Sequence, residues 1–150
     1  MKRFEFRAAK VLDLRQRQHQ QTLAALAAVQ RTRDLAAAAL AQAEQAVASA
    51  HAEMRTCLAA GGTTTNLLRH RNWIIGLQAG TEGCRRQLAQ RELEVERAAA
   101  DVRRTHRQSR VLERLKDRAW EAYQAESDRQ SAIEMDQLAV MQHARRTSGV

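Results

Sequence analysis

The side chains that most often carry out catalysis or hold metals are sparse and scattered in this chain. There are five histidines and two cysteines, and none has a second metal ligand three or four residues away with a third nearby. We recognise no glycine-rich phosphate loop, activated nucleophile or carboxylate pair in a plausible pocket. We therefore expect no catalytic residue, no metal site, no cofactor and no enzymatic activity.

Arginine is the one chemically active side chain that recurs in a pattern. Members of one row are spaced three or four residues apart and so share one side of a helix: Arg103, Arg107, Arg110, Arg114 and Arg118. Such a row suits an acidic channel wall or a phosphate backbone. However, Glu113, Asp117 and Glu121 lie within reach for intrahelical ion pairs. A charged row on a helix pair is more often its solvated face.

The composition indicates that these side chains are carried by helices. The chain has 150 residues, of which 44% are hydrophobic, only 3% are aromatic and 28% are charged, with no proline. Much of the apolar fraction is alanine, which favours helices but buries little surface. The net charge is +8, and there is no apolar signal segment or run of about 20 apolar residues. We expect one all-α domain, residues 1–150, in the cytoplasm.

Glycine placement divides the chain into two helices. The six glycines occur only at positions 61, 62, 76, 80, 83 and 149. Because glycine and proline are the residues that interrupt helices, the long stretches without them predict uninterrupted helices. We expect one helix over about 5–59, a turn over about 60–66 and a second helix over about 67–146. Thr65 or Asn66 is the expected N-cap of the second helix.

Apolar and small residues at alternating spacings of three and four form one stripe along each helix, here called the seam. In the first helix the seam is Leu26, Val29, Arg33, Ala36, Leu40, Ala43, Val47, Ala50, Met54 and Cys57. In the second it is Ile74, Leu77, Thr81, Cys84, Leu88, Arg91, Val95, Ala98, Val102, Thr105, Ser109 and Leu112. This spacing is typical of a coiled coil. The sequence thus predicts a long two-helix antiparallel coiled-coil hairpin.

The two predicted helices differ in length. Folding about the turn places residue i opposite roughly residue 126 minus i, so the second helix continues past the N-terminus from about Glu126. Its last turns carry Ile133, Met135, Leu138, Val140 and Met141, with no helix of the same chain to cover them. This end is either a surface for a partner protein or a frayed tail.

One side of the second helix close to the turn is unusually smooth. Trp73, Gly76, Gly80 and Gly83 share it, and each glycine inside a helix costs about 1 kcal/mol relative to alanine. A groove of bare backbone beside one large aromatic ring would let another protein approach closely. The alternative is a helix that starts late or is kinked here, with Trp73 packed on the turn.

Several short motifs resemble the FliJ family, and their order and spacing cover the whole chain. The N-terminus matches in Phe4–Glu5–Phe6–Arg7–Ala8 and Lys10–Val11–Leu12–Asp13–Leu14–Arg15. After the turn come Asn72–Trp73–Ile74, and near the C-terminus Glu134–Met135–Asp136–Gln137–Leu138 precedes Arg145–Arg146. FliJ proteins are coiled-coil hairpins of the bacterial flagellar type III export apparatus, where they serve as chaperone and central stalk.

The resemblance implies partners at both ends. The end with the termini would enter the hexameric export ATPase and promote its assembly, with Phe4, Phe6, Leu12 and Leu14 beside the second helix around Trp120 and Tyr123. The implied ATPase contacts are Phe4, Phe6, Arg7, Leu12, Arg15, Met135, Asp136 and Leu138. The implied contacts with the cytoplasmic domain of the export gate are Trp73, Leu77, Gly80, Cys84, Val47 and Met54. Chaperones of late export substrates are further partners, and the protein would lie peripherally at the inner-membrane export apparatus.

Three other functions are consistent with parts of the sequence. A stalk of a needle-type secretion system is similar, although the paired phenylalanines at the start favour the flagellar branch. A nucleic-acid-binding coiled coil would use the net charge of +8, but no aromatic cluster for base stacking is evident, so we expect no nucleic acid. The third is a dimerising scaffold.

Overall fold

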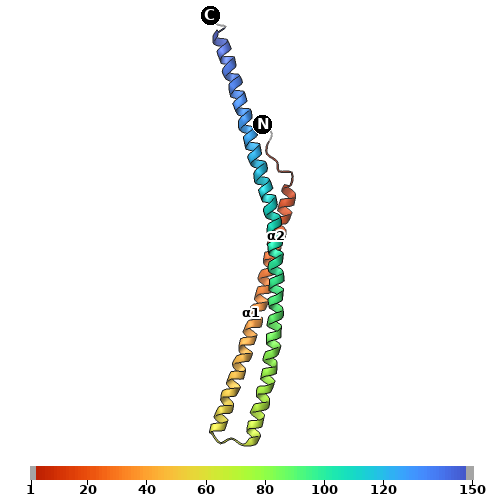
Figure 1. Ribbon diagram of the computed structural model, residues 1–150, viewed down its shortest axis with the longest axis vertical. Helices are drawn as coiled ribbons and strands as arrows, with labels where there is room; N and C mark the ends of the chain where they lie inside the picture. Colours follow the sequence, from red (N-terminus) through yellow and green to blue (C-terminus); the bar gives the residue numbers. More distant parts are fainter. Residues whose placement is uncertain (1–2, 148–150) are drawn as a thin grey trace. The chain divides into compact units, whose positions relative to one another are not determined.

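The computed structural model describes the backbone of residues 3–147 and the side chains of residues 3–144. It contains two helices, α1 (Ala9–Ala59) and α2 (Thr64–Thr147), and no strand in that range. A single short loop joins them, and next to it they run side by side in opposite directions (Figure 1). The predicted fold class, an all-α hairpin with a longer second helix, is confirmed.

Packing divides the chain into two compact parts. The turn unit is Gln20–Arg104, and the termini unit is Met1–His19 together with Thr105–Val150. The side chains of Arg145 and Arg146, the basic end noted above, lie outside the described residues.

Two consecutive glycines end α1 and reverse the chain. Gly61 has a φ of +73°, which is the left-handed region that glycine adopts without strain. Its N–H donates to the carbonyl of Leu58 (3.1 Å), and the N–H of Gly62 donates to the carbonyl of Cys57 (2.9 Å). This pair of bonds is the Schellman motif, which satisfies the last carbonyls of a helix. A Cβ at Gly62 would lie 2.8 Å from the Cys57 carbonyl oxygen, so both glycines are required.

The helix boundaries differ from the predicted ones at two places. The turn is shorter, because α2 begins at Thr64, and the N-cap is Thr63, whose Oγ1 accepts a hydrogen bond from the N–H of Asn66 (3.4 Å). The prediction of Thr65 or Asn66 was wrong because the glycines reverse the chain so quickly that the first hydroxyl of the run caps the helix. At the other end, α1 begins at Ala9 instead of about residue 5, because Phe4 packs against α2, as described below.

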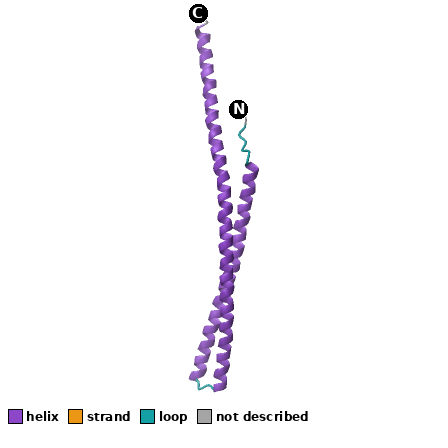
Figure 2. Ribbon diagram, turned by 45° about the vertical axis from the view of Figure 1, so that its right-hand side comes forward, coloured by secondary structure: helices purple, strands orange, loops and turns teal. Residues whose placement is uncertain are grey.

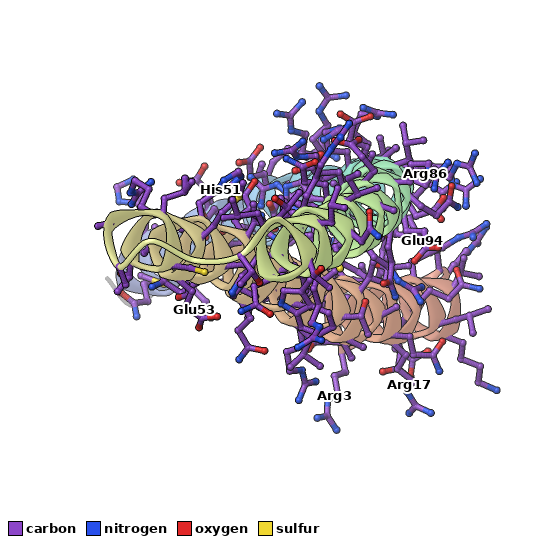
Figure 3. All side chains as sticks on the ribbon, turned by 90° about the horizontal axis from the view of Figure 1, so that it is seen from below. Arg3, Arg17, His51, Glu53, Arg86 and Glu94 are labelled. Carbon is purple, nitrogen blue, oxygen red and sulfur yellow. The ribbon has the colours of Figure 1, made fainter. Side chains whose placement is uncertain are left out.

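The turn unit is held together by the predicted seam. Every predicted seam residue in this unit, Leu26–Cys57 on α1 and Ile74–Val102 on α2, is buried or half-buried. The most buried are Ala36, Ala50, Ile74 and Thr81. Charged side chains such as Glu53 and Arg86 project outward from the helices (Figure 3). Since the buried residues are mostly small, the interface is thin and its hydrophobic stabilisation is modest.

In the termini unit the seam becomes more polar. Leu12 is 7% exposed, and the buried residues of α2 here are Thr105 and Ser109. Their hydroxyls do not stay unsatisfied: the Ser109 Oγ donates to the carbonyl of His106 (3.0 Å), and the Thr105 Oγ1 lies 3.2 Å from Nδ1 of His19. Pairing in this unit therefore relies on side-chain hydrogen bonds as well as burial.

Within the termini unit, α2 extends well past the N-terminal segment, as predicted (Figures 1 and 2). Every described side chain from Asp128 to Ala144 is exposed. This C-terminal extension of α2, residues 128–144, thus has no covering helix from its own chain. Neither described helix has a stretch long and apolar enough to cross a lipid bilayer.

Candidate functional site

The side of α2 close to the turn is open, as the sequence indicated. Trp73 is 59% exposed. A Cβ added at Gly76, Gly80 or Gly83 would meet no described atom within 4 Å, so no contact in the part of the chain that the structure describes requires glycine there. The helix runs through this stretch from Thr64 without interruption, which excludes a late start as the reason for the glycines. We call Trp73, Gly76, Gly80 and Gly83 the glycine face.

The remaining residues that the sequence implied for gate contact lie along the seam. Val47, Met54, Leu77 and Cys84 are all half-buried. The structure therefore places Trp73 and Gly80 in the open, while the other four are partly covered by packing of α1 against α2. The exposed parts of these four side chains lie in the turn unit, as the glycine face does.

A charged hollow beside the seam was not anticipated from the sequence. It is lined by Glu44 and Val47 of α1 and by Gln78, Thr81, Glu82 and Arg85 of α2. Arg85 donates to Glu44 across the helices (3.0 Å) and to Glu82 on its own helix. Hydrogen bonds to Glu44 and then to Glu82 raise the pKa of Arg85 above its ordinary value. The predicted register places Glu44 and Arg85 nearly opposite each other, so the sequence indicated that these two residues lie close together.

An aromatic cluster fixes the segment before α1. The Phe4 ring meets Trp120 edge-on with centroids 5.0 Å apart, and it lies 5.4 Å from Tyr123. Trp120 and Tyr123 stack on each other at 5.6 Å. The predicted position of Phe4 beside these two rings is confirmed. Aromatic pairs of this geometry contribute about 0.5–1.5 kcal/mol beyond their burial, which accounts for a defined, non-helical N-terminal segment.

Polar contacts hold the first turns of α1 against α2. Arg15 donates to Gln108 (3.3 Å) and to Gln18 on its own helix (2.9 Å). Gln16 donates to Glu113 (3.3 Å). Leu12 and Arg15, which the sequence implied for ATPase contact, are thus engaged within the hairpin, whereas Phe6 is half-buried and Arg7 is exposed.

Glu113 is the main carboxylate of this polar contact. Its oxygens accept from Arg110 (2.9 Å) and from Gln16 (3.3 Å). These two hydrogen bonds, the one from Arg110 first, hold the pKa of Glu113 below its ordinary value. Both hydrogen bonds favour the charged form, and the one from Gln16 is present only when α1 is paired with α2.

The C-terminal extension presents apolar side chains on two sides of α2. Met135 is 66% exposed, and Leu138, three residues on, lies near it. Ile133 and Val140 lie seven residues apart on the other side, where they line a hollow with Asp136, Gln137 and Met141. Exposed apolar residues gathered on one helix mark an interaction surface more often than isolated ones do.

The possible catalytic groups are as dispersed in space as in the sequence. Among the described residues, no three His, Cys, Asp or Glu side chains are placed to hold a metal ion. Cys57 and Cys84 are both free thiols. His19 and His106 do approach each other, with ring centroids 5.2 Å apart, an arrangement that the sequence spacing alone did not suggest.

Comparison with protein families gives a match over nearly the whole chain. The family model described as flagellar FliJ protein matches residues 4–148 of the chain. Neither the curated proteins nor the solved structures contain a match.

Proposed function

The chain belongs to the FliJ family of flagellar proteins, and we propose that it is the stalk that links the export ATPase to the export gate. Membership of this family implies a role in flagellar export and supports a component that is not an enzyme. The observation that carries the proposal is that the chain leaves different side chains uncovered in its two units. These are the glycine face of the turn unit and the apolar C-terminal extension of the termini unit.

We place the ATPase contact in the termini unit. Met135, Asp136 and Leu138 are exposed on a helix without a covering partner, so a protein ring that encloses them would bury apolar surface that water now covers. We assign Phe4, Phe6 and Arg7, which precede α1 in the same unit, to the ATPase contact as well. Leu12 and Arg15 act indirectly, because their packing and hydrogen bonds hold α1 in place beside α2.

We place the gate contact at the glycine face. Tryptophan is one of the side chains that are enriched among the residues that dominate binding energy at interfaces. Beside Trp73, the missing side chains of Gly76 and Gly80 allow a partner to reach the backbone of α2. Val47, Met54, Leu77 and Cys84 supply the apolar edges of the seam.

Binding at both ends would couple the ATPase to substrate entry. A single stalk inside a six-fold ring contacts the subunits unequally, which stabilises the assembled hexamer and biases the nucleotide states of its subunits. Chaperones of late substrates would dock on the same protein as they deliver their cargo. The protein would then act in the cytoplasm, held at the inner membrane through its partners.

Affinities of the full chain for the purified export ATPase and for the gate's cytoplasmic domain test the proposal. We expect Trp73→Ala to weaken gate binding at least tenfold and leave ATPase binding unchanged. Leu138→Asp should do the opposite. Ile75→Ala, on the other side of the helix from Trp73, and Gln130→Asp, about two turns before Leu138, serve as matched controls. Wild-type protein that binds neither partner, or a Trp73→Ala variant that loses both equally, would contradict the proposal.

A further inference from the structure

Four arginines of the predicted row lie in the termini unit and form one stripe on α2. Arg107, Arg110, Arg114 and Arg118 are all exposed, and we call them the basic row. Residues three, four and seven positions apart share a helix face. The residues that pack against α1 here are Thr105, Ser109 and Leu112, and by the same helical period they lie on the opposite side. The basic row therefore faces away from α1.

Most of this positive charge is not neutralised by the described residues. Within that part of the chain, Arg110 is the one member of the row with an ion pair, to Glu113 (2.9 Å). Among the described residues, no carboxylate pairs with Arg107, Arg114 or Arg118, even though Asp117 and Glu121 lie in the same stretch. Pairs with those two acids, which the sequence allowed, are not formed.

Apolar side chains lie among the arginines. Val111 is 59% exposed, and it lines a hollow with His106, Arg107, Arg110 and Arg114. Leu115, one turn further on, is also exposed. A surface of guanidinium groups with aliphatic patches between them fits a protein surface that offers carboxylates beside apolar residues.

The same features disfavour a nucleic acid as the ligand. Single strands are held by aromatic side chains on which bases stack, and none lies in the basic row between Arg107 and Arg118. The aromatic residues that follow the row, Trp120 and Tyr123, already pack with Phe4. Guanidinium groups bind carboxylates and phosphates alike through two parallel hydrogen bonds, so the aliphatic side chains between the arginines, and not the arginines themselves, favour a protein ligand.

We propose that the basic row, with Val111 and Leu115, binds an acidic surface of the export ATPase. This inference rests on the proposed ATPase contact and specifies its chemistry. The row spans twelve residues, or roughly 16 Å of helix, so it would engage carboxylates along one stretch of the ring's inner wall. Arg110 is already paired, so Arg107, Arg114 and Arg118 supply the new ion pairs.

A charge-matched comparison in the full chain tests the proposal. The row variant is Arg107→Glu with Arg114→Glu, and the control is Lys10→Glu with Arg17→Glu, two exposed cations on α1 in the same unit. Both change the net charge by the same amount. Affinity for purified export ATPase is measured at low and at high salt, and circular dichroism checks that helicity is unchanged.

We expect the row variant to bind the ATPase at least tenfold more weakly at low salt, and the control within about threefold of wild type. Salt should weaken the wild type more than the row variant, because ion pairs at the interface are screened. Equal losses in both variants, or none in the row variant while wild type binds, would overturn this inference and leave the proposed function intact. If wild type fails to bind the ATPase, the proposed function falls too. Row-dependent binding of a 20-base-pair DNA duplex, with no effect on ATPase binding, would overturn the protein ligand in favour of nucleic acid.

Discussion

Two adjacent isoleucines of α2 offer a direct test of how the hairpin is held together. Ile74 is 5% exposed and lies in the seam, whereas Ile75 is 52% exposed and lies outside it. The two share residue type, helix and distance from the turn. Comparing the two alanine variants therefore separates the stability contributed by contact with α1 from the effect of the substitution itself.

The expected losses follow from burial. Truncation of a buried isoleucine to alanine costs about 2–5 kcal/mol, and less where the surroundings can relax. A two-helix interface is open at its edges, so we expect about 2 kcal/mol for Ile74→Ala. Ile75→Ala removes apolar surface that is only half buried, and alanine has the higher helix propensity. The second effect largely offsets the first, so we expect the free energy of unfolding to fall by about 0.5 kcal/mol or less.

Urea unfolding monitored by circular dichroism at 222 nm gives both free energies of unfolding. The seam predicts a clearly lower midpoint for Ile74→Ala and a nearly unchanged one for Ile75→Ala, with similar slopes. Equal losses, or a larger loss for Ile75→Ala, would refute the assignment of Ile74 to the interface.

Three further changes probe the turn, the interrupted seam and the polar contact. Gly61→Ala forces a left-handed φ on a residue with a Cβ, so thermal unfolding should show a loss of about 1–2 kcal/mol. Arg33 is the one charged residue in the α1 seam of the turn unit. Its Nε lies 2.8 Å from Asp34 but is buried without a hydrogen bond. We expect Arg33→Leu to raise the free energy of unfolding in urea by about 1 kcal/mol, and a lower free energy would contradict this. Hydrogen bonds from Arg110 on the same helix and from Gln16 of α1 lower the pKa of Glu113 in the folded protein, so the stabilisation by its carboxylate is present above the ordinary carboxyl pKa of about 4.3 and is lost as the pH falls through the folded value. Urea titrations from pH 6 to pH 3 should show a smaller decrease for Glu113→Gln than for wild type, and identical profiles would contradict the contact.

The hairpin was predictable because its pattern is repetitive. Alternating spacings of three and four residues identify the seam, and the pair Gly61–Gly62 is the strongest turn signal in the chain. The start of α1 was not predictable in the same way. It depends on Phe4 contacting Trp120 and Tyr123, residues that are distant in sequence and do not belong to the repeat.

The candidate surfaces were predicted only in part. Exposure of Trp73 follows from its position beside the seam, and the C-terminal extension follows from unequal helix lengths. The cross-helix pair of Arg85 with Glu44 and the contact of His19 with His106 depend on side-chain conformations that spacing does not specify. Leu12 was implied for partner contact because it lies in a family motif, but it is buried inside the hairpin. A motif match therefore does not predict that a residue is exposed.

Site-specific photo-crosslinking tests the assignment of different partners to the two surfaces most directly. A photoreactive amino acid is placed at position 73 or at position 135 of the full chain, which is then mixed with the export ATPase and the gate's cytoplasmic domain together. We predict that position 73 crosslinks the gate and position 135 crosslinks the ATPase. Capture of the same partner by both positions, or of neither partner by either position, would contradict the assignment.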